Sequence, residues 1–188
     1  FDRVRPEDVP EEYRETFIAA RENLPLVAEA LGGFNRNSHL IRELLGENGP
    51  RMYLFLFQNN AELRPTGGFI GSYGLLDVTR GRVRNFFVDG IFNPDGQLKE
   101  SVVPPSPVQK VSTAWSLHDS NWWPDFPTSA EKAIFFYEKT GGPTVDGVVT
   151  FTPTVIREAL RLTGPIDIPE YGVTIDADSF LEVVQEEV

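Results

Sequence analysis

The feature that most constrains the fold is an apolar run that ends abruptly in a polar, glycine-containing turn. Residues 52–57 read MYLFLF, and the next segment, 58–68, reads QNNAELRPTGG. An uninterrupted apolar run of this length is typical of a strand that is buried on both faces. Open α/β sheets bind ligands just beyond the carboxyl ends of such strands. We therefore predict a central strand over 52–58, with a ligand site in the turn that follows it.

The segments after this turn predict a β-hairpin and then a long loop. Residues 69–79 and 82–89 are rich in apolar and aromatic side chains, and only Arg80-Gly81 separates them. A two-residue connection that contains glycine is typical of a tight hairpin turn. Residues 90–127 combine many prolines with all three tryptophans, which predicts an irregular segment. Loops of this length inside a compact domain are more often functional than accidental.

Regular structure is predicted to return after residue 127. Thr128 and Glu131 have the Thr-x-x-Glu spacing of a capping box, which predicts the start of a helix that runs to Lys139. Thr152-Pro153 has the form of an N-cap followed by proline in the first helical position. The other predicted elements are a strand over 145–151, a helix over 153–163, short strands over 166–168 and 173–175, and a final helix over 176–188.

The first 48 residues predict a helical lead-in. Apolar residues recur on one helical stripe from Pro10 to Leu31, and we expect Pro25 to kink this helix. Gly32-Gly33 is a helix-ending signal. A second, short helix is predicted from Asn37 to Leu45, with Gly46 as its terminator.

This order of elements indicates the fold class and the domain organisation. It predicts a layered α/β/α arrangement with a mixed central sheet, in one α/β domain over residues 1–188. Residues 1–48 form the helical lead-in, and residues 51–188 supply the sheet and the other helices. Because the chain begins at Phe1 and an acidic amphipathic pattern is still in progress at its end, we expect a fragment of a longer protein.

Composition excludes several classes of function. The net charge of −11 disfavours nucleic acid and anionic membrane surfaces as partners of the body, because both need a positive face. The absence of cysteine excludes thiolate catalysis, cysteine zinc sites and disulfides. No stretch of the sequence has the roughly 20 apolar residues of a membrane span, and no signal-peptide pattern opens it.

The polar turn after the first strand is the first candidate site. A guanidinium, a hydroxyl and two glycines that let backbone N–H groups converge can hold a phosphate or a carboxylate. The alternative is that the glycines only turn the chain, while Glu62 pairs with Arg64 or caps backbone groups. The glycine spacings of nucleotide-binding loops do not occur. The candidate ligand-binding residues here are Asn59, Glu62, Arg64, Thr66, Gly67 and Gly68.

The segment HDSNWWPDFP, at 118–127, is the second candidate site. Asp119 and Asp125 offer hard oxygen ligands for a divalent cation such as Mg²⁺. The alternative for Asp125 is a cap on the helix that follows. Asn121 and Trp122 are candidate ligand contacts, and the alternative for the tryptophans is that they anchor the loop to the core.

Both candidate sites depend on one geometric condition. The turn that carries Arg64 and the loop that carries Asn121 must meet across a shared opening. The two histidines, His39 and His118, are interpreted as surface or capping residues, because a general base needs a partner that the sequence does not show.

Three segments also carry a family resemblance. QNNAELRPTGGFIGSYG, HDSNWWPDFPTSAEKAIFFYE and VDGVVTFTPTVIREALRLTGPIDIP occur in this order. With them the chain resembles the domain-of-unknown-function 4012 family of prokaryotic envelope-associated proteins. The resemblance implies a full-length protein with an N-terminal membrane anchor and an extracytoplasmic body, whose activity is unestablished.

A more distant similarity implies a chemistry. The unit at 145–168 is similar to a segment of the LytR-CpsA-Psr proteins, which transfer glycopolymers from polyprenyl pyrophosphate carriers to the cell wall. That similarity implies a LytR-CpsA-Psr-like fold, with Arg64 as a phosphate-binding arginine and Glu62 or Asp119 as a magnesium ligand. Two motifs of those proteins, R-x-D and proline-arginine-aspartate, have no clear counterpart here.

Two functional hypotheses follow from these observations. The first is a cell-envelope module that binds an anionic, glycan or polyprenyl-phosphate ligand without chemistry. The alternative is a magnesium-dependent phosphotransferase that moves a glycopolymer from its polyprenyl pyrophosphate carrier to the cell wall.

Overall fold

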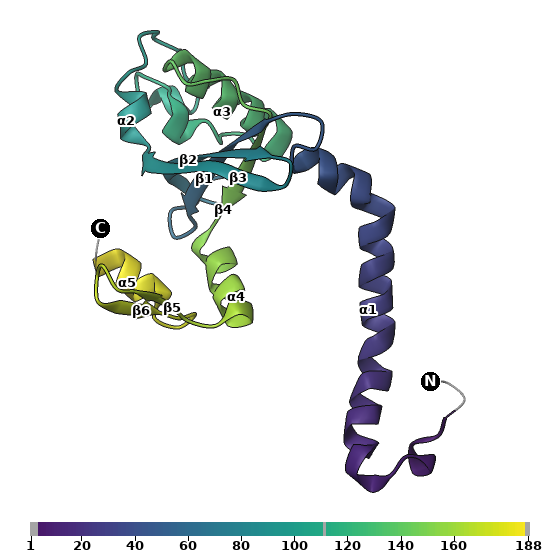
Figure 1. Cartoon of the computed structure of the whole chain (residues 1–188). Helices are drawn as coiled ribbons and strands as arrows, with labels where there is room; N and C mark the ends of the chain where they lie inside the picture. Colours follow the sequence, from purple (N-terminus) through teal and green to yellow (C-terminus); the bar gives the residue numbers. More distant parts are fainter. Residues whose placement is uncertain (1–3, 111, 187–188) are drawn as a thin grey trace.

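A mixed four-stranded sheet forms the centre of the molecule. The structure, a computed structural model, describes residues 4–110 and 112–186. The strand order is β3-β2-β1-β4, in which β2 is antiparallel to both β1 and β3, and β4 is parallel to β1. The predicted mixed α/β sheet is therefore confirmed (Figure 1). Its strands are β1 (Arg51–Asn59), β2 (Phe69–Thr79), β3 (Arg82–Gly90) and β4 (Gly147–Phe151).

One face of this sheet packs against α3 (Phe126–Lys139) and forms the core (Figure 1). The alternation along β1 places Leu54 and Leu56 on this face, where they are 0% and 2% exposed. Burial of apolar surface is the main stabilising contribution in such a layer, so it also holds the irregular segment before α3 against the sheet. The buried cluster consists of Leu54, Leu56, Ile70, Tyr73, Ile91, Trp115, Leu117, Ala133, Phe136, Tyr137 and Val145.

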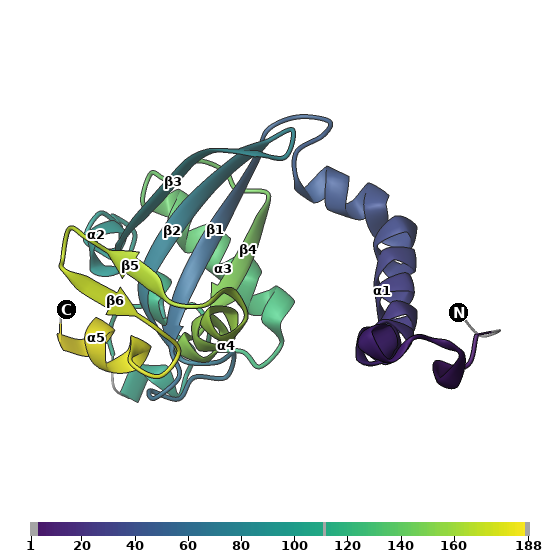
Figure 2. The same ribbon diagram turned by 60° about the horizontal axis from the view of Figure 1, so that its bottom comes forward.

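The opposite face of the sheet is lined by phenylalanines. Phe55 stacks on Phe151 with ring centroids 5.4 Å apart, and it meets Phe86 edge-on at 5.7 Å. The uninterrupted apolar run of β1 thus serves two apolar faces, as its pattern predicted. The C-terminal elements lie on this side of the sheet (Figure 2). They are α4 (Pro153–Thr163), β5 (Ile166–Ile168), β6 (Val173–Ile175) and α5 (Phe180–Glu186), while residues 187 and 188 of the predicted final helix lie outside the described part.

The predicted hairpin between β2 and β3 is confirmed. Arg80 and Gly81 both have positive φ, at 51° and 72°, which is the geometry that a tight two-residue turn requires. The turn is bound to the end of the preceding helix, because the Arg80 N–H donates to the Gly46 carbonyl at 2.9 Å and the Gly81 N–H donates to the Leu45 carbonyl at 2.8 Å. The hairpin therefore fixes the point where the helical lead-in joins the sheet.

The lead-in is one helix rather than two, so the prediction that Gly32-Gly33 ends a helix is wrong. The helix α1 runs without a break from Glu11 to Leu44. A terminating glycine adopts positive φ, and neither Gly32 nor Gly33 does so. Gly46 does, at φ 74°, and the Gly46 and Glu47 N–H groups donate back to the carbonyls of Glu43 and Arg42. The predicted terminator at Gly46 is therefore confirmed.

The helix α1 extends away from the rest of the molecule (Figure 1). None of its residues is buried. Within the described part of the chain, no helix combines the length and the apolar character that crossing a membrane requires.

The start of α3 corrects a second prediction. The N-cap is Asp125, not Thr128, and the Asp125 carboxylate accepts hydrogen bonds from the Thr128 N–H at 3.0 Å and the Thr128 hydroxyl at 2.6 Å. Both residue types are good caps, and the chain enters the helix three residues earlier than the Thr-x-x-Glu spacing indicated. These bonds lower the pKa of Asp125, chiefly through the Thr128 hydroxyl. The alternative role of Asp125 as a helix cap is the one the structure shows.

Candidate functional site

The turn between β1 and β2 has a shape that its glycines alone permit. Gly67 has φ 130°, a conformation that L side chains rarely adopt. A Cβ on Gly68 would lie 2.2 Å from the Asn59 carbonyl oxygen, far inside van der Waals contact. Asn59 holds the first half of the turn, since its Oδ1 accepts from the Ala61 N–H at 3.0 Å. The polar residues after β1 are thus folded back over the end of that strand.

The tryptophan-bearing loop contacts this turn, which meets part of the geometric condition on which both candidate sites depend. Asn121 is 2% exposed, and its Nδ2 donates to the Gly68 carbonyl at 2.8 Å. The Arg64 Nε lies 3.5 Å from the Asp119 Oδ1. The alternative pairing of Glu62 with Arg64 is not what the structure shows, because Glu62 accepts from the Asn59 amide at 3.4 Å. Arg64 from the first candidate site and Asp119 and Asn121 from the second therefore lie together beyond β1.

His118 joins this site through two carboxylates. Its Nδ1 lies 2.6 Å from the Asp95 Oδ2 and its Nε2 lies 3.1 Å from the Asp119 Oδ2. Asp95 is the last residue of α2 (Phe92–Asp95), and its Oδ1 also accepts from the Leu117 N–H at 2.8 Å. We call Arg64, Asp95, His118 and Asp119 the charge cluster.

The carboxylates keep His118 protonated at neutral pH. Asp119 first, and then Asp95, raise the pKa of His118 from 6.5 to about 9, against the opposing effect of burial. His118 in turn is the main cause that lowers the pKa of Asp119, and Arg64 adds to it. Charge consequently alternates along the cluster, from the Asp95 carboxylate to the His118 imidazolium, the Asp119 carboxylate and the Arg64 guanidinium.

Two phenylalanine rings flank the cations of the cluster. The Arg64 guanidinium carbon lies 5.3 Å from the Phe69 ring centroid, within the range of a cation–π contact. The His118 ring lies 6.0 Å from Phe69 and 5.6 Å from Phe92. Phe92 is 65% exposed. The cluster therefore has an apolar, solvent-facing edge.

Three polar atoms are buried beside this junction without a hydrogen-bond partner among the described residues. They are the Gln58 Oε1, the Ser120 Oγ and the Asn121 Oδ1. The Gln58 Oε1 lies next to Gly67, since a Cβ there would be 2.6 Å from it. Buried polar atoms are normally satisfied, so an unpaired group of this kind indicates a place where water or a ligand donates.

The other predicted site residues are less directly involved. The Thr66 hydroxyl accepts from the Gln58 Nε2 at 3.3 Å and so braces the turn from inside. Trp122 and Trp123 are partly buried against the core, which is the anchoring role given as their alternative. Asp125 caps α3 instead of joining Asp119. The described residues include no group of three or more histidine, cysteine, aspartate or glutamate side chains arranged to hold a metal ion.

Sequence reasoning missed the centre of this site. His118 was interpreted as a surface or capping residue, yet its side chain is only 25% exposed. Asp95 is not among the predicted site residues, because it comes from a different element than Asp119 and the sequence between them carries no regular spacing. The one available signal was the adjacency of a histidine and an aspartate at 118 and 119.

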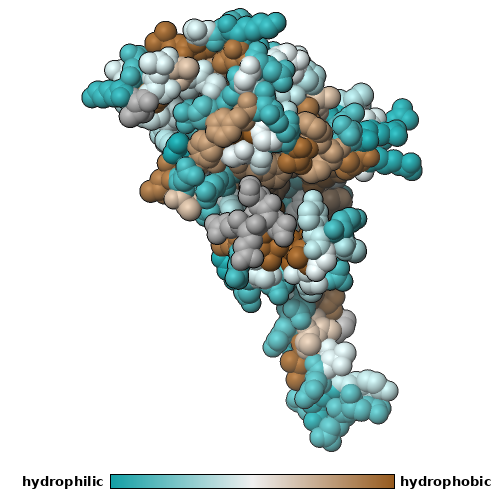
Figure 3. Space-filling model, turned by 90° about the vertical axis from the view of Figure 1, so that its left-hand side faces the viewer, coloured by the Kyte–Doolittle hydropathy of each residue, from teal (hydrophilic) through white to brown (hydrophobic). Residues whose placement is uncertain are grey.

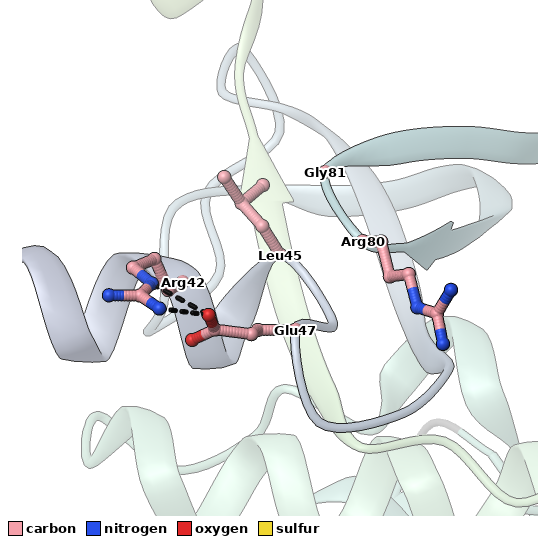
Figure 4. Close-up of a pocket in the computed structure, with 5 residues that line it drawn as sticks. All are labelled: Arg42, Leu45, Glu47, Arg80 and Gly81. Carbon is pink, nitrogen blue, oxygen red and sulfur yellow. Dashed lines mark hydrogen bonds and ion pairs between the residues drawn. The ribbon is translucent and has the colours of Figure 1, made fainter.

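A separate hollow lies at the opposite end of β1. It has a volume of about 470 Å³ and is lined by Arg42, Leu45, Glu47, Arg80 and Gly81 (Figure 4). Arg42 is paired with Glu47 across it. Because the pair is satisfied and the lining belongs to the helix–hairpin junction, we regard this hollow as structural.

Fold and site together define a mixed α/β domain with a charged, aromatic-edged candidate site beyond its central strand. The family described as Protein of unknown function (DUF4012) matches residues 48–188, which is most of the chain. The chain belongs to this family. Neither a search of curated proteins nor a search of solved structures found a match.

Proposed function

We propose that this domain binds an anionic ligand, a phosphate attached to a glycan or a polyprenyl chain, on the extracytoplasmic side of the cell envelope. The observation that carries the proposal is the meeting of Arg64 and protonated His118 beside the Phe69 and Phe92 rings. The site lies where open α/β sheets bind ligands, beyond the carboxyl ends of the parallel pair β1 and β4.

Arg64 is the residue that receives the phosphate. Its side chain is 32% exposed and its contact with Asp119 is a single ion pair at 3.5 Å. Partly exposed pairs of this kind contribute at most about 1 kcal/mol. A phosphate can offer the guanidinium two parallel hydrogen bonds in place of this single contact, and Asp119 keeps its contact with His118.

The surroundings of Arg64 suit the organic part of such a ligand. The exposed ring of Phe92 provides apolar surface next to the cations. We also propose that the domain has the layered α/β/α fold of the LytR-CpsA-Psr proteins and that the ligand's organic part is a polyprenyl carrier. The proposed location at the cell envelope is based on the family resemblance.

The direct test is a calorimetric titration with farnesyl phosphate. We expect Arg64→Ala to weaken binding at least tenfold. Arg64→Lys should weaken it less, because lysine keeps the charge but cannot donate two parallel hydrogen bonds. Asp119 is also the main cause of the raised pKa of His118, so Asp119→Asn is titrated below about pH 6, where His118 stays protonated. There the variant should strengthen binding, since it removes the carboxylate that competes for Arg64. Farnesol, which lacks the phosphate, should bind much more weakly to the unmodified protein.

Arg84→Ala is the matched control, because Arg84 is an exposed arginine on β3, away from the cluster. Its affinity for farnesyl phosphate should equal that of the unmodified protein. Equal losses in Arg64→Ala and Arg84→Ala, or no binding at all, would refute the proposed site. Repeating the titration with magnesium chloride tests the phosphotransferase alternative, which requires magnesium to raise the affinity through Asp119.

A further inference from the structure

The helix α1 lacks the packing that a helix of its composition needs. It has no buried residue over Glu11–Leu44. Its interior contains Pro25, which costs roughly 3 kcal/mol there, and Gly32 and Gly33, which cost about 1 kcal/mol each relative to alanine. Most helices in proteins are stabilised by packing of an apolar face, so α1 is expected to have a partner. In the space-filling view the helix extends below the body and shows apolar patches within a hydrophilic surface (Figure 3).

The apolar residues of α1 are spaced for pairing with another helix. One row of them alternates at intervals of four and three residues, which is the 3.5-residue period of a coiled coil rather than the 3.6-residue period of a helix on a globular core. Other apolar residues lie off this row, namely Ile18, Leu26, Leu40 and Leu44. Several are largely exposed, including Leu31 at 63% and Phe34 at 58%. We call this row the heptad stripe; it consists of Tyr13, Phe17, Ala20, Leu24, Val27, Leu31, Phe34, Ser38 and Ile41.

The residues that disfavour a helix lie outside this stripe. Pro25, Gly32 and Gly33 follow stripe positions by one or two residues, and in the repeat they fall on the outward side of the helix, away from the seam and its two flanks. The face opposite the stripe carries charge at seven-residue intervals. Its members are Glu15, Glu22, Glu29, Arg36 and Glu43, four acidic residues and one basic. An acidic outer face of this kind disfavours an anionic membrane surface as the partner.

The charges beside the stripe distinguish the possible arrangements of two such helices. One flank carries Arg14, Arg21 and Arg42. In an antiparallel pair of identical helices this flank would face itself and bring arginines together. In a parallel pair it faces the other flank, whose residues Thr16, Asn23, Ala30 and Asn37 are uncharged. A parallel pair of copies therefore avoids like-charge contacts along its whole length.

We infer that α1 pairs with α1 of a second copy of this chain in a parallel coiled coil along the heptad stripe. The interface is separate from the charge cluster, because α1 joins β1 at Arg51 and the cluster lies beyond the other end of that strand. Ser38 is the one polar member of the stripe, and a polar residue in the seam helps to set the register.

The association is tested by sedimentation of the whole chain over a range of concentrations. The unmodified protein should reach twice the 21.1 kDa of a single chain. Leu31→Glu should remain monomeric, because it buries an unpaired charge in the seam. Leu26→Glu is the matched control: Leu26 is 65% exposed, against 63% for Leu31, but lies outside the stripe. A monomeric unmodified protein, or equal dissociation by both variants, would overturn the inference.

The orientation is tested by cross-linking, for which the absence of native cysteine is convenient. Under mild oxidation, Leu24→Cys should form a covalent dimer, since equivalent seam positions adjoin in a parallel, in-register pair. Glu22→Cys, on the outer face, should not. Cross-linking of Glu22→Cys alone, or of neither variant, would exclude the parallel arrangement even if a dimer forms.

Discussion

At the scale of single residues, His118 lies in an environment that differs strongly from that of a free side chain. Both of its ring nitrogens face carboxylates, at 2.6 Å and 3.1 Å. His118 therefore binds its proton more tightly in the folded protein than in the unfolded chain. This preference, which raises the pKa of His118 to about 9, makes the stability of the protein depend on pH.

The sign of that dependence is fixed by the raised pKa. The contribution of His118 is complete below the unfolded pKa near 6.5 and is lost as the pH rises through about 9. Comparing the unmodified protein with His118→Gln by urea unfolding should give the largest difference at about pH 6, on the order of 3 kcal/mol at most, and little difference at about pH 10.

A second measurement separates this effect from a general change in stability. In a His39→Gln background, His118 is the one remaining imidazole and its titration can be followed directly by NMR. A midpoint near the ordinary histidine value would contradict the pKa of about 9. A His118→Gln deficit that stays constant with pH would show that the residue acts through packing rather than through charge.

At the scale of elements, the parts that were predictable are those specified by local chemistry. The apolar run of β1, the Arg80-Gly81 turn and the terminator at Gly46 are each encoded by adjacent residues, and each is present in the structure. The Gly32-Gly33 signal misled because glycine permits a helix end without imposing one. The helical spacing of apolar residues continues through Gly32 and Gly33, and the helix continues with it.

The candidate site was predictable in its location but not in its membership. Arg64 follows a strand, and Asp119 and Asn121 precede a helix, and both of these elements could be placed from sequence. The contact of His118 with Asp95 depends on how the segment between β3 and α3 folds over the core. The path of this segment is set by packing of Trp115 and Leu117 in the core, and no periodic pattern in the sequence predicts that packing.

The β1–β2 turn gives a sharp prediction at this scale. Gly68→Ala should destabilise the protein by about 3 kcal/mol or more, because its Cβ would meet the Asn59 carbonyl at 2.2 Å and backbone cannot easily give way. Gly71→Ala, in the adjoining strand, has no atom within 4 Å of its Cβ and should change stability little. Thermal unfolding of the two variants checks this, and equal stability would mean that the turn has another accessible shape.

At the scale of the whole molecule, the body is expected to fold without most of α1. Since that helix buries none of its residues, deleting residues 1–38 should move the melting temperature by no more than about 3 °C, the shift that about 1 kcal/mol produces in a domain of this size. The near-ultraviolet circular dichroism of the three tryptophans should also be unchanged.

A longer deletion supplies the contrast. Removing residues 1–46 also takes away the Leu45 and Gly46 carbonyls that accept from the hairpin turn, and it should lower the melting temperature clearly. If the shorter deletion already unfolds the body, α1 contributes to the fold through contacts with the sheet. That result would contradict the expectation that the body folds without most of α1.

The position of β1 has a mechanical consequence. The strand is joined at its start to α1 and is flanked on its two sides by the ladders to β2 and β4. A force applied through the helix therefore enters the sheet at β1 and is shared by the ladders on both of its sides. The strand that takes up this force is also the one that leads to the charge cluster, so a pull on the helix is transmitted towards the site.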